Sequence, residues 1–80
     1  MSNGTQRTLT FGERAVGLSF NPSGDGDVAK CKEEFAAVID RMNDLRASTE
    51  DLEVRRMASV AITEAQTAQM WAVKALTWRF

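Results

Sequence analysis

The last third of the chain, from Ser48 to Phe80, is one uninterrupted helical pattern that is apolar around more of its circumference than a single contact requires. A helix packed against one neighbour needs an apolar stripe of only about 100°. Here two stripes run at three- and four-residue steps, the first formed by Met57, Ala61, Ala68, Trp71, Ala75 and Trp78 and the second by Ile62, Ala65, Val73, Leu76 and Phe80. One partner helix cannot cover both stripes, so we expect this segment to be buried on several sides.

The small size of the chain makes this extra burial necessary. With 80 residues the chain forms one domain and buries only about 60 to 65% of its unfolded surface, so its core alone gives marginal stability. Disulfide bonds cannot supply the missing stability because Cys31 is the only cysteine, and without histidine a zinc site has almost no ligands to use. We therefore expect a homo-oligomeric helical bundle, in which sister chains cover the apolar faces.

The charge balance narrows the range of partners. Ten basic residues stand against eleven acidic ones, whereas proteins that coat duplex DNA usually have a basic face and a high isoelectric point. The first residues lack the apolar core of a signal peptide, and no run approaches the roughly 18 apolar residues that span a bilayer. We expect a soluble cytoplasmic protein that binds neither duplex DNA nor a membrane; a small anion in a local pocket is not excluded.

The first part of the chain is polar and rich in turn residues. Residues 1–8 are typical of a flexible terminus, and Thr10 and Glu13 have the spacing of a capping box, which predicts a short helix over residues 10–18. Residues 19–26 contain the only proline and are expected to form a turn that ends in a cap for the next helix. The candidates for that cap are Ser23, Asp25 and Asp27.

Residues 27–46 form a second helical segment with one clear apolar stripe. The stripe consists of Val28, Cys31, Phe35, Val38, Ile39, Met42 and Leu45. Ser48 and Asp51 mark the start of the segment 49–78, so only a tight turn separates two helices of about 30 and 45 Å. So short a connection makes them antiparallel neighbours. The sequence therefore predicts an all-α single domain, an antiparallel helical hairpin with a short N-terminal helix, in which the second arm overhangs the first.

Residues suited to catalysis are sparse. No histidine is present, no carboxylate pair is placed for acid–base work, and Cys31 falls on a core position, where a thiol is usually inert. The segment from Gly24 to Asp27 lacks the remaining ligands of a calcium loop, and there is no glycine-rich phosphate loop with a lysine. We expect no enzyme activity, no metal site and no cofactor.

An aromatic ring and several cations remain as candidates for binding an anion. They are Phe20 beside the turn, Lys30 and Lys32 just inside a helix start, Arg14 in the preceding segment, and Arg55 and Arg56 near the start of the long helix. Such a set can stack a nucleobase and hold phosphates. Each residue also has a simpler role, since Phe20 can pack on the hairpin as a staple and a surface lysine or arginine is usually only solvated.

Two stretches share a pattern with a known family. They are the run from Ile62 to Ala75, ITEAQTAQMWAVKA, and the apolar-lysine pair Cys31-Lys32. With them, residues 19–78 resemble the helical hairpin domain of phage proteins that sequester cyclic oligonucleotide signals, the sponges that counter CBASS and Thoeris immunity. The resemblance implies a homo-oligomer in the host cell cytoplasm, expected to be a hexamer. It also implies that cyclic dinucleotides of the 3′,3′-cyclic GMP–AMP type bind between protomers and are not cleaved. Some relatives also bind cyclic trinucleotides in separate pockets.

The same resemblance assigns roles to individual residues. Lys32 corresponds to a phosphate-binding lysine, and Arg56, ten residues before Gln66, corresponds to a second basic contact. The family's stacking aromatic lies upstream of the lysine, and because this chain has no tyrosine a phenylalanine must replace it. The candidate ligand-binding residues are therefore Phe11, Phe20, Asn21, Ser23, Lys32, Arg56, Thr63 and Gln66.

A different class of function also fits the apolar surface of the long helix. The chain can be a helical-bundle adaptor or inhibitor that binds a host or phage protein through an apolar helix face. Under that hypothesis the change Lys32→Ala has no effect on function, whereas in a sponge it weakens ligand binding.

Overall fold

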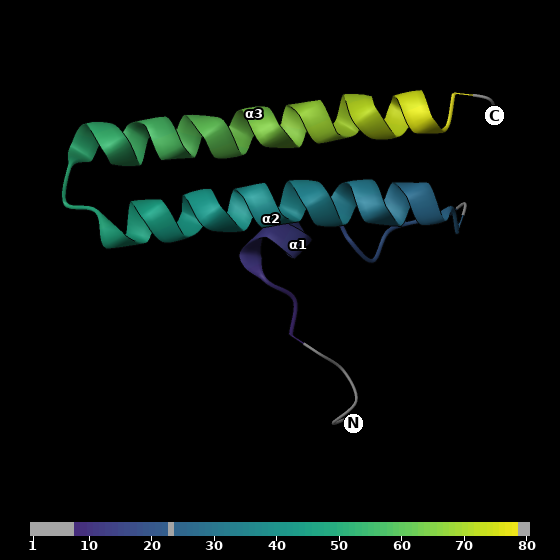
Figure 1. The fold of residues 1–80 in the computed structure, drawn as a ribbon, viewed down its shortest axis with the longest axis horizontal. Helices are drawn as coiled ribbons and strands as arrows, with labels where there is room; N and C mark the ends of the chain where they lie inside the picture. The colour runs from purple at the N-terminus through teal and green to yellow at the C-terminus, as the bar shows by residue number, and fades with distance from the viewer. Residues whose placement is uncertain (1–7, 23, 79–80) are drawn as a thin grey trace.

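The structure, a computed structural model, describes residues 8–22 and 24–78, and those residues form three helices and no strand (Figure 1). Helix α1 spans Phe11–Ala15, α2 spans Gly26–Ser48 and α3 spans Leu52–Leu76. Helices α2 and α3 run side by side in opposite directions, and α1 packs against α2. The predicted all-α class and the antiparallel hairpin are confirmed; the predicted flexible terminus, residues 1–8, lies outside the described residues except for Thr8.

The capping box that opens α1 is present as predicted. The Thr10 hydroxyl accepts from the Glu13 backbone N–H at 3.1 Å, and the Glu13 carboxylate accepts from the Thr10 backbone N–H at 2.9 Å. The helix ends at Ala15, earlier than the predicted residue 18, because Gly17 takes a left-handed conformation with φ of 63°. The Leu18 N–H then donates back to the Glu13 carbonyl at 2.9 Å, which closes a Schellman motif at the helix end.

The ends of the two long helices differ from the predicted ones. Asp25, one of the three candidate caps, opens α2 by accepting from the Asp27 N–H at 2.8 Å. Ser48 does not start the second arm as predicted; it is the last residue of α2, and its hydroxyl donates to the Leu45 carbonyl at 3.1 Å. The cap of α3 is Asp51, whose carboxylate accepts from two N–H groups of the first turn.

The predicted overhang of the second arm is also wrong. Helix α2 has 23 residues and α3 has 25, so the arms lie alongside each other over nearly their whole length (Figure 1). The reason is that α2 runs two residues beyond its predicted end, while α3 begins later and stops at Leu76. The end of α3 is thereby placed beside the start of α2, where Asp27 and Ala72 border the same hollow.

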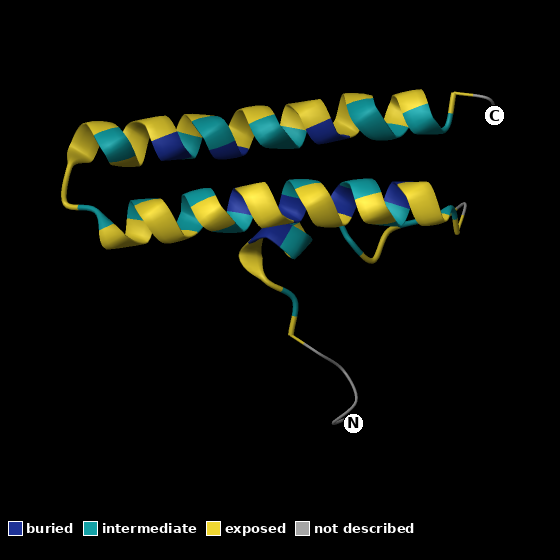
Figure 2. Ribbon diagram, in the orientation of Figure 1, coloured by how far each residue is buried: buried dark blue, intermediate teal, exposed yellow. Residues whose placement is uncertain are grey.

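The buried core is small, and the buried segments are spread along α2 and α3 and at the contact between α1 and α2 (Figure 2). One cluster consists of Val16, Ala36, Ile39 and Ile62, and Val28 and Ala58 are also buried. Ile39 is fully buried, but Val38 and Leu45 are 51% and 39% exposed, so the apolar stripe predicted for α2 is only partly the buried one. The buried face is rotated because α2 contacts α1 as well as α3 and turns its small Ala36 and its Ile39 toward both.

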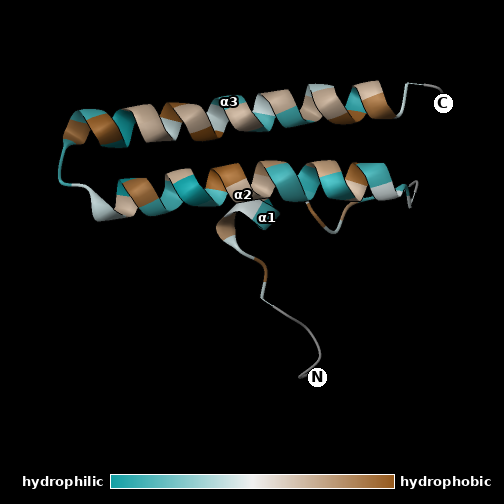
Figure 3. Ribbon diagram, viewed as in Figure 1, coloured by the Kyte–Doolittle hydropathy of each residue, from teal (hydrophilic) through white to brown (hydrophobic). Residues whose placement is uncertain are grey.

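Helix α3 keeps one of its two apolar stripes outside the hairpin. Ile62 packs into the core, whereas Met57, Trp71 and Trp78 are 49%, 65% and 75% exposed. Apolar residues recur along the length of the helix (Figure 3); Phe80 lies outside the described residues. Within the single chain, this outer stripe is therefore left largely exposed. None of the described helices is long and apolar enough to cross a membrane.

Gly12 allows α1 to pack closely on α2. Its N–H donates to the Asp40 carboxylate at 2.7 Å. A Cβ atom at this position would lie 2.2 Å from the Ala36 carbonyl oxygen, which is backbone and cannot rotate away.

We predict that Gly12→Ala destabilises the protein by about 1 to 3 kcal/mol, the usual cost of overpacking, because α1 must move off α2. Urea unfolding followed by circular dichroism measures the effect. Gly26→Ala is the matched control, since a Cβ there meets nothing within 4 Å, and it should be neutral or slightly stabilising. Equal stability of the two variants would contradict this description of the contact.

Candidate ligand-binding site

Lys32 is a buried cation held by backbone carbonyls. Only 6% of the residue is exposed. Its ammonium donates to the Gly17 carbonyl at 3.0 Å and to the Phe20 carbonyl, and it lies 5.6 Å from the centroid of the Phe20 ring. The lysine therefore joins α2 to the loop that follows α1.

No carboxylate neutralises this ammonium within the described ranges 8–22 and 24–78, where no ion pair of Lys32 occurs. A buried charge without a counterion is costly, and neutral carbonyls offset only part of that cost. An ammonium has three N–H donors, and the two carbonyls accept from two of them. The third donor and the uncompensated charge together favour a bound anion.

Lys32 also lines a pocket of about 450 Å³ that is large enough for part of a small ligand. The loop after α1 forms one side, α2 the floor and the end of α3 the other side. The lining residues are Phe20, Asn21, Pro22, Val28, Lys32, Val73 and Thr77. An apolar wall with one charged group is the usual composition of a site that binds a small molecule.

The Phe20 ring is free to contact a ligand in this pocket. Phe20 is 72% exposed, whereas a ring that served as a staple would be covered by the hairpin. Asn21 lines the same pocket, and its amide donates to the Asp25 carbonyl at 3.0 Å, which ties the loop to the start of α2. Ser23 lies outside the described residues. The Phe20 ring and the Lys32 ammonium thus line the same pocket.

Two other candidates form a separate group beside α1. Phe11 and Gln66 line a pocket of about 350 Å³ with Arg14 and Ala15. The Arg46 guanidinium lies 5.3 Å from the centroid of the Phe11 ring, and the Gln66 amide donates to the Ala15 carbonyl at 3.5 Å. Phe11 and Gln66 therefore do not meet Lys32 in the single chain.

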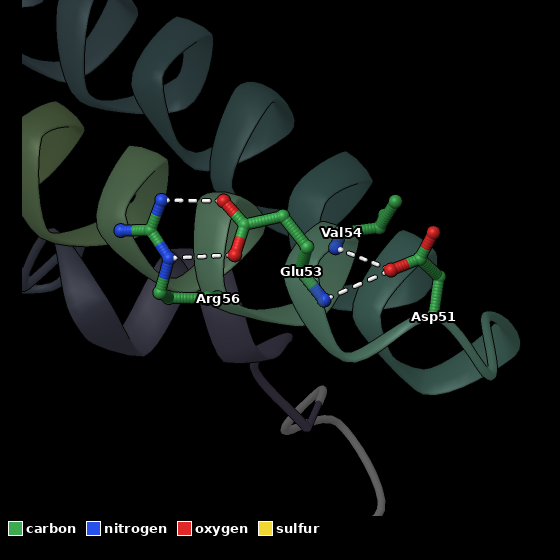
Figure 4. Close-up of polar contacts among 4 residues, drawn as sticks. All are labelled: Asp51, Glu53, Val54 and Arg56. Carbon is green, nitrogen blue, oxygen red and sulfur yellow. Dashed lines mark hydrogen bonds and ion pairs between the residues drawn. The ribbon is translucent and has the colours of Figure 1, made fainter.

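Arg56 and Thr63 belong to neither pocket. Arg56 lies near the start of α3, where it donates to both carboxylate oxygens of Glu53 at 3.0 and 2.6 Å (Figure 4). It precedes Val73 by seventeen residues of one helix, which places it about 26 Å from the Lys32 pocket at 1.5 Å per residue. Thr63 is exposed. If either residue joins Lys32 at one ligand, it must come from another protomer.

Cys31 lies on a different side of α2 from the Lys32 pocket. It borders a hollow of about 510 Å³ between the start of α2 and the end of α3. Burial and, to a smaller degree, the nearby Glu34 raise the pKa of its thiol. A raised pKa disfavours the reactive thiolate.

In the described part of the chain, no group of three or more His, Cys, Asp or Glu residues is placed to hold a metal ion.

Three residues that complete the pocket were not predicted from the sequence. Val73 and Thr77 come from the end of α3, and Val28 comes from the first turn of α2. An antiparallel hairpin with arms of equal length pairs the start of one arm with the end of the other, so the register alone could have indicated them. Gly17 gave no comparable signal, because the contact of its carbonyl with Lys32 depends on the loop geometry.

The fold and the site define a small helical-hairpin protein with a pocket at one end that is lined by a buried lysine. A comparison with known families matches residues 13–77 to the hairpin domain described as Acb2/Tad1, which covers most of the chain. The chain belongs to this family, the anti-CBASS and anti-Thoeris sponges that the sequence resembles. The family points to anti-defence proteins that sequester cyclic nucleotides. No match was found among curated proteins or among solved structures.

The ion pair of Arg56 gives a prediction about pH. Hydrogen bonds from Arg56 lower the pKa of the Glu53 carboxyl, and partial desolvation opposes them weakly. A lowered pKa means that the pair stabilises the folded state above the ordinary pKa of Glu and that this contribution is lost as the pH falls through the lowered value.

We expect Arg56→Gln to raise the pKa of Glu53 toward its ordinary value, as measured by carbon-13 NMR of the side-chain carboxyl during a pH titration. Arg55→Gln is the control, because Arg55 donates instead to the Thr49 carbonyl, and it should leave the titration of Glu53 unchanged. An unchanged pKa in the Arg56 variant would show that the pair does not form in solution.

Proposed function

We propose that this chain is a phage-encoded anti-defence sponge that binds and sequesters cyclic dinucleotide immune signals in the host cytoplasm without cleaving them. Lys32 binds a phosphate and Phe20 stacks a base. The observation that carries the proposal is the buried ammonium of Lys32, which has carbonyl partners but no ion pair in the described part of the chain and faces a pocket beside an exposed ring. Family membership supports the same conclusion.

The chemistry of the ligand fits the charge and shape of the pocket. A cyclic dinucleotide carries two phosphates and two bases, and each protomer offers one cation and one ring in a pocket that is open to solvent. A two-fold interface between protomers presents the same patch twice. Two pockets brought together in this way match both halves of the ligand and exclude water from the phosphates, which strengthens charged hydrogen bonds.

We further propose that the chain assembles as a homo-oligomer, with a hexamer as the expected state. The exposed outer stripe, with Met57 and Trp71 on α3 and Trp78 just after its end, supports this assembly. Arg56 and Thr63 reach a ligand only across such an interface. Phe11 and Gln66, beside the smaller pocket, are the residues of this chain suited to a cyclic trinucleotide.

Lys32→Gln tests the proposed function. We expect it to weaken binding of a cyclic dinucleotide by roughly 1.5 to 3 kcal/mol, the contribution of a charged hydrogen bond, while the oligomer stays intact. Isothermal titration with a panel of cyclic di- and trinucleotides, including 3′,3′-cyclic GMP–AMP, measures the affinities.

Lys30→Gln is the matched control, since Lys30 lies two residues away on α2 and is exposed outside this pocket, and it should bind as the wild type does. Bound nucleotide should also be recovered unchanged after the complex is heated. Absence of binding by folded wild-type protein would refute the sponge and leave the adaptor, in which the outer stripe of α3 binds another protein.

The oligomer is tested by sedimentation velocity over a range of concentrations. We expect a species several times heavier than the 8.9 kDa chain. Trp71→Lys should shift the equilibrium toward smaller species, because it places a charge on the apolar stripe. Glu50→Gln, in the turn before α3, changes the net charge by the same amount and should leave assembly unaffected. A wild-type protein that sediments as a monomer at all concentrations would contradict the proposed assembly.

A further inference from the structure

The loop between α1 and α2 contains two glycines with nearly the same left-handed conformation but different surroundings. Gly17 has φ of 63° and Gly24 has φ of 64°. The carbonyl of Gly17 accepts from the Lys32 ammonium, whereas Gly24 donates to the Asn21 carbonyl at 3.0 Å and does not contact Lys32. Substitutions at Gly17 and at Gly24 can therefore be compared to distinguish the effect of backbone strain from the effect of the contact with Lys32.

Gly17 brings two carbonyls to one point. It ends α1 by donating to the Arg14 carbonyl at 3.1 Å, and its own carbonyl accepts from the Phe20 N–H at 2.9 Å, which closes a tight turn. Because of this turn, the carbonyls of Gly17 and Phe20 both lie against the Lys32 ammonium. The left-handed conformation of Gly17 is thus the local cause of the geometry around the cation.

The ammonium of a lysine sits on a flexible four-carbon chain, and binding a ligand with it normally costs side-chain freedom. A side chain that is already fixed in the free protein loses less on binding. We propose that Gly17 is a positioning residue for the anion site, whose left-handed turn fixes the Lys32 ammonium with one donor left for a ligand phosphate. This inference rests on the proposed function, and it assigns to Gly17 a role in affinity in addition to its role in ending α1.

The test compares Gly17→Ala, Gly17→Asn and Gly24→Ala. Asparagine tolerates the left-handed conformation better than alanine does. A Cβ at Gly17 meets only the Phe20 Cβ, at 3.9 Å, and one at Gly24 meets nothing within 4 Å, so neither alanine clashes and both carry the same kind of strain. Backbone strain should therefore lower the melting temperature of both alanine variants, and Gly17→Ala should lower it somewhat further because it also loosens the contact with the buried Lys32.

Their ligand affinities should differ. With the member of the nucleotide panel that binds the wild type most tightly, we expect Gly17→Ala to raise Kd about 10-fold, Gly24→Ala about twofold or less, and Gly17→Asn to restore most of the lost affinity. Adding Gly17→Ala to Lys32→Gln should weaken binding no further, because the two residues act through one contact. A purely structural role for Gly17 predicts additive effects instead.

The outcomes separate the two hypotheses. If the wild type binds, Lys32→Gln loses affinity, and Gly17→Ala binds no worse than Gly24→Ala, the positioning role is refuted and the proposed function stands. Additive effects in the double variant also refute the positioning role. If the folded wild type binds no member of the panel, both hypotheses fail. If Gly17→Ala does not fold, the additivity test is repeated with Gly17→Asn, alone and combined with Lys32→Gln. Additive effects on Kd would again refute the positioning role.

Discussion

The contact between the Lys32 ammonium and the carbonyls of Gly17 and Phe20 connects the fold to the proposed function. A cation on the floor of a helical hairpin would ordinarily turn outward into water, because burial without a counterion is unfavourable. Here the chain that leaves α1 makes a left-handed turn and supplies two backbone acceptors, so the charge stays under the loop. The same turn leaves the Phe20 ring exposed beside it. Lysine, loop and ring thus form one unit.

The rest of the structure offers little burial to support that unit within one chain. The core consists of a few small and medium side chains around Ile39. The outer face of α3 displays Trp71 and Trp78, with the Lys74 ammonium 5.3 and 5.8 Å from the centroids of their rings. Large aromatic side chains are among the residues enriched where proteins associate. On this account, assembly supplies stability and also completes the pockets.

The sequence predicted the local features and missed those that depend on three-dimensional register. The capping box at Thr10 and the hairpin follow from spacing alone, and the structure has them. The burial of Lys32 contradicts its position on the polar side of the apparent α2 stripe. It could not be read from spacing, since it depends on contacts with α1 and its loop. The roles of Val73 and Thr77 in the pocket depend on where α3 ends, and helix ends are the least certain part of any pattern.

The most direct test of the central claim observes the Lys32 ammonium while a cyclic dinucleotide binds. Nitrogen-15 NMR of lysine ammonium groups, assigned with Lys32→Gln, follows the resonance during a titration with 3′,3′-cyclic GMP–AMP. We predict that the Lys32 resonance shifts in proportion to bound nucleotide and gains a coupling to phosphorus across the new hydrogen bond, while the Lys30 resonance stays in place. Saturation of the protein with nucleotide while the Lys32 resonance stays unchanged would contradict the account.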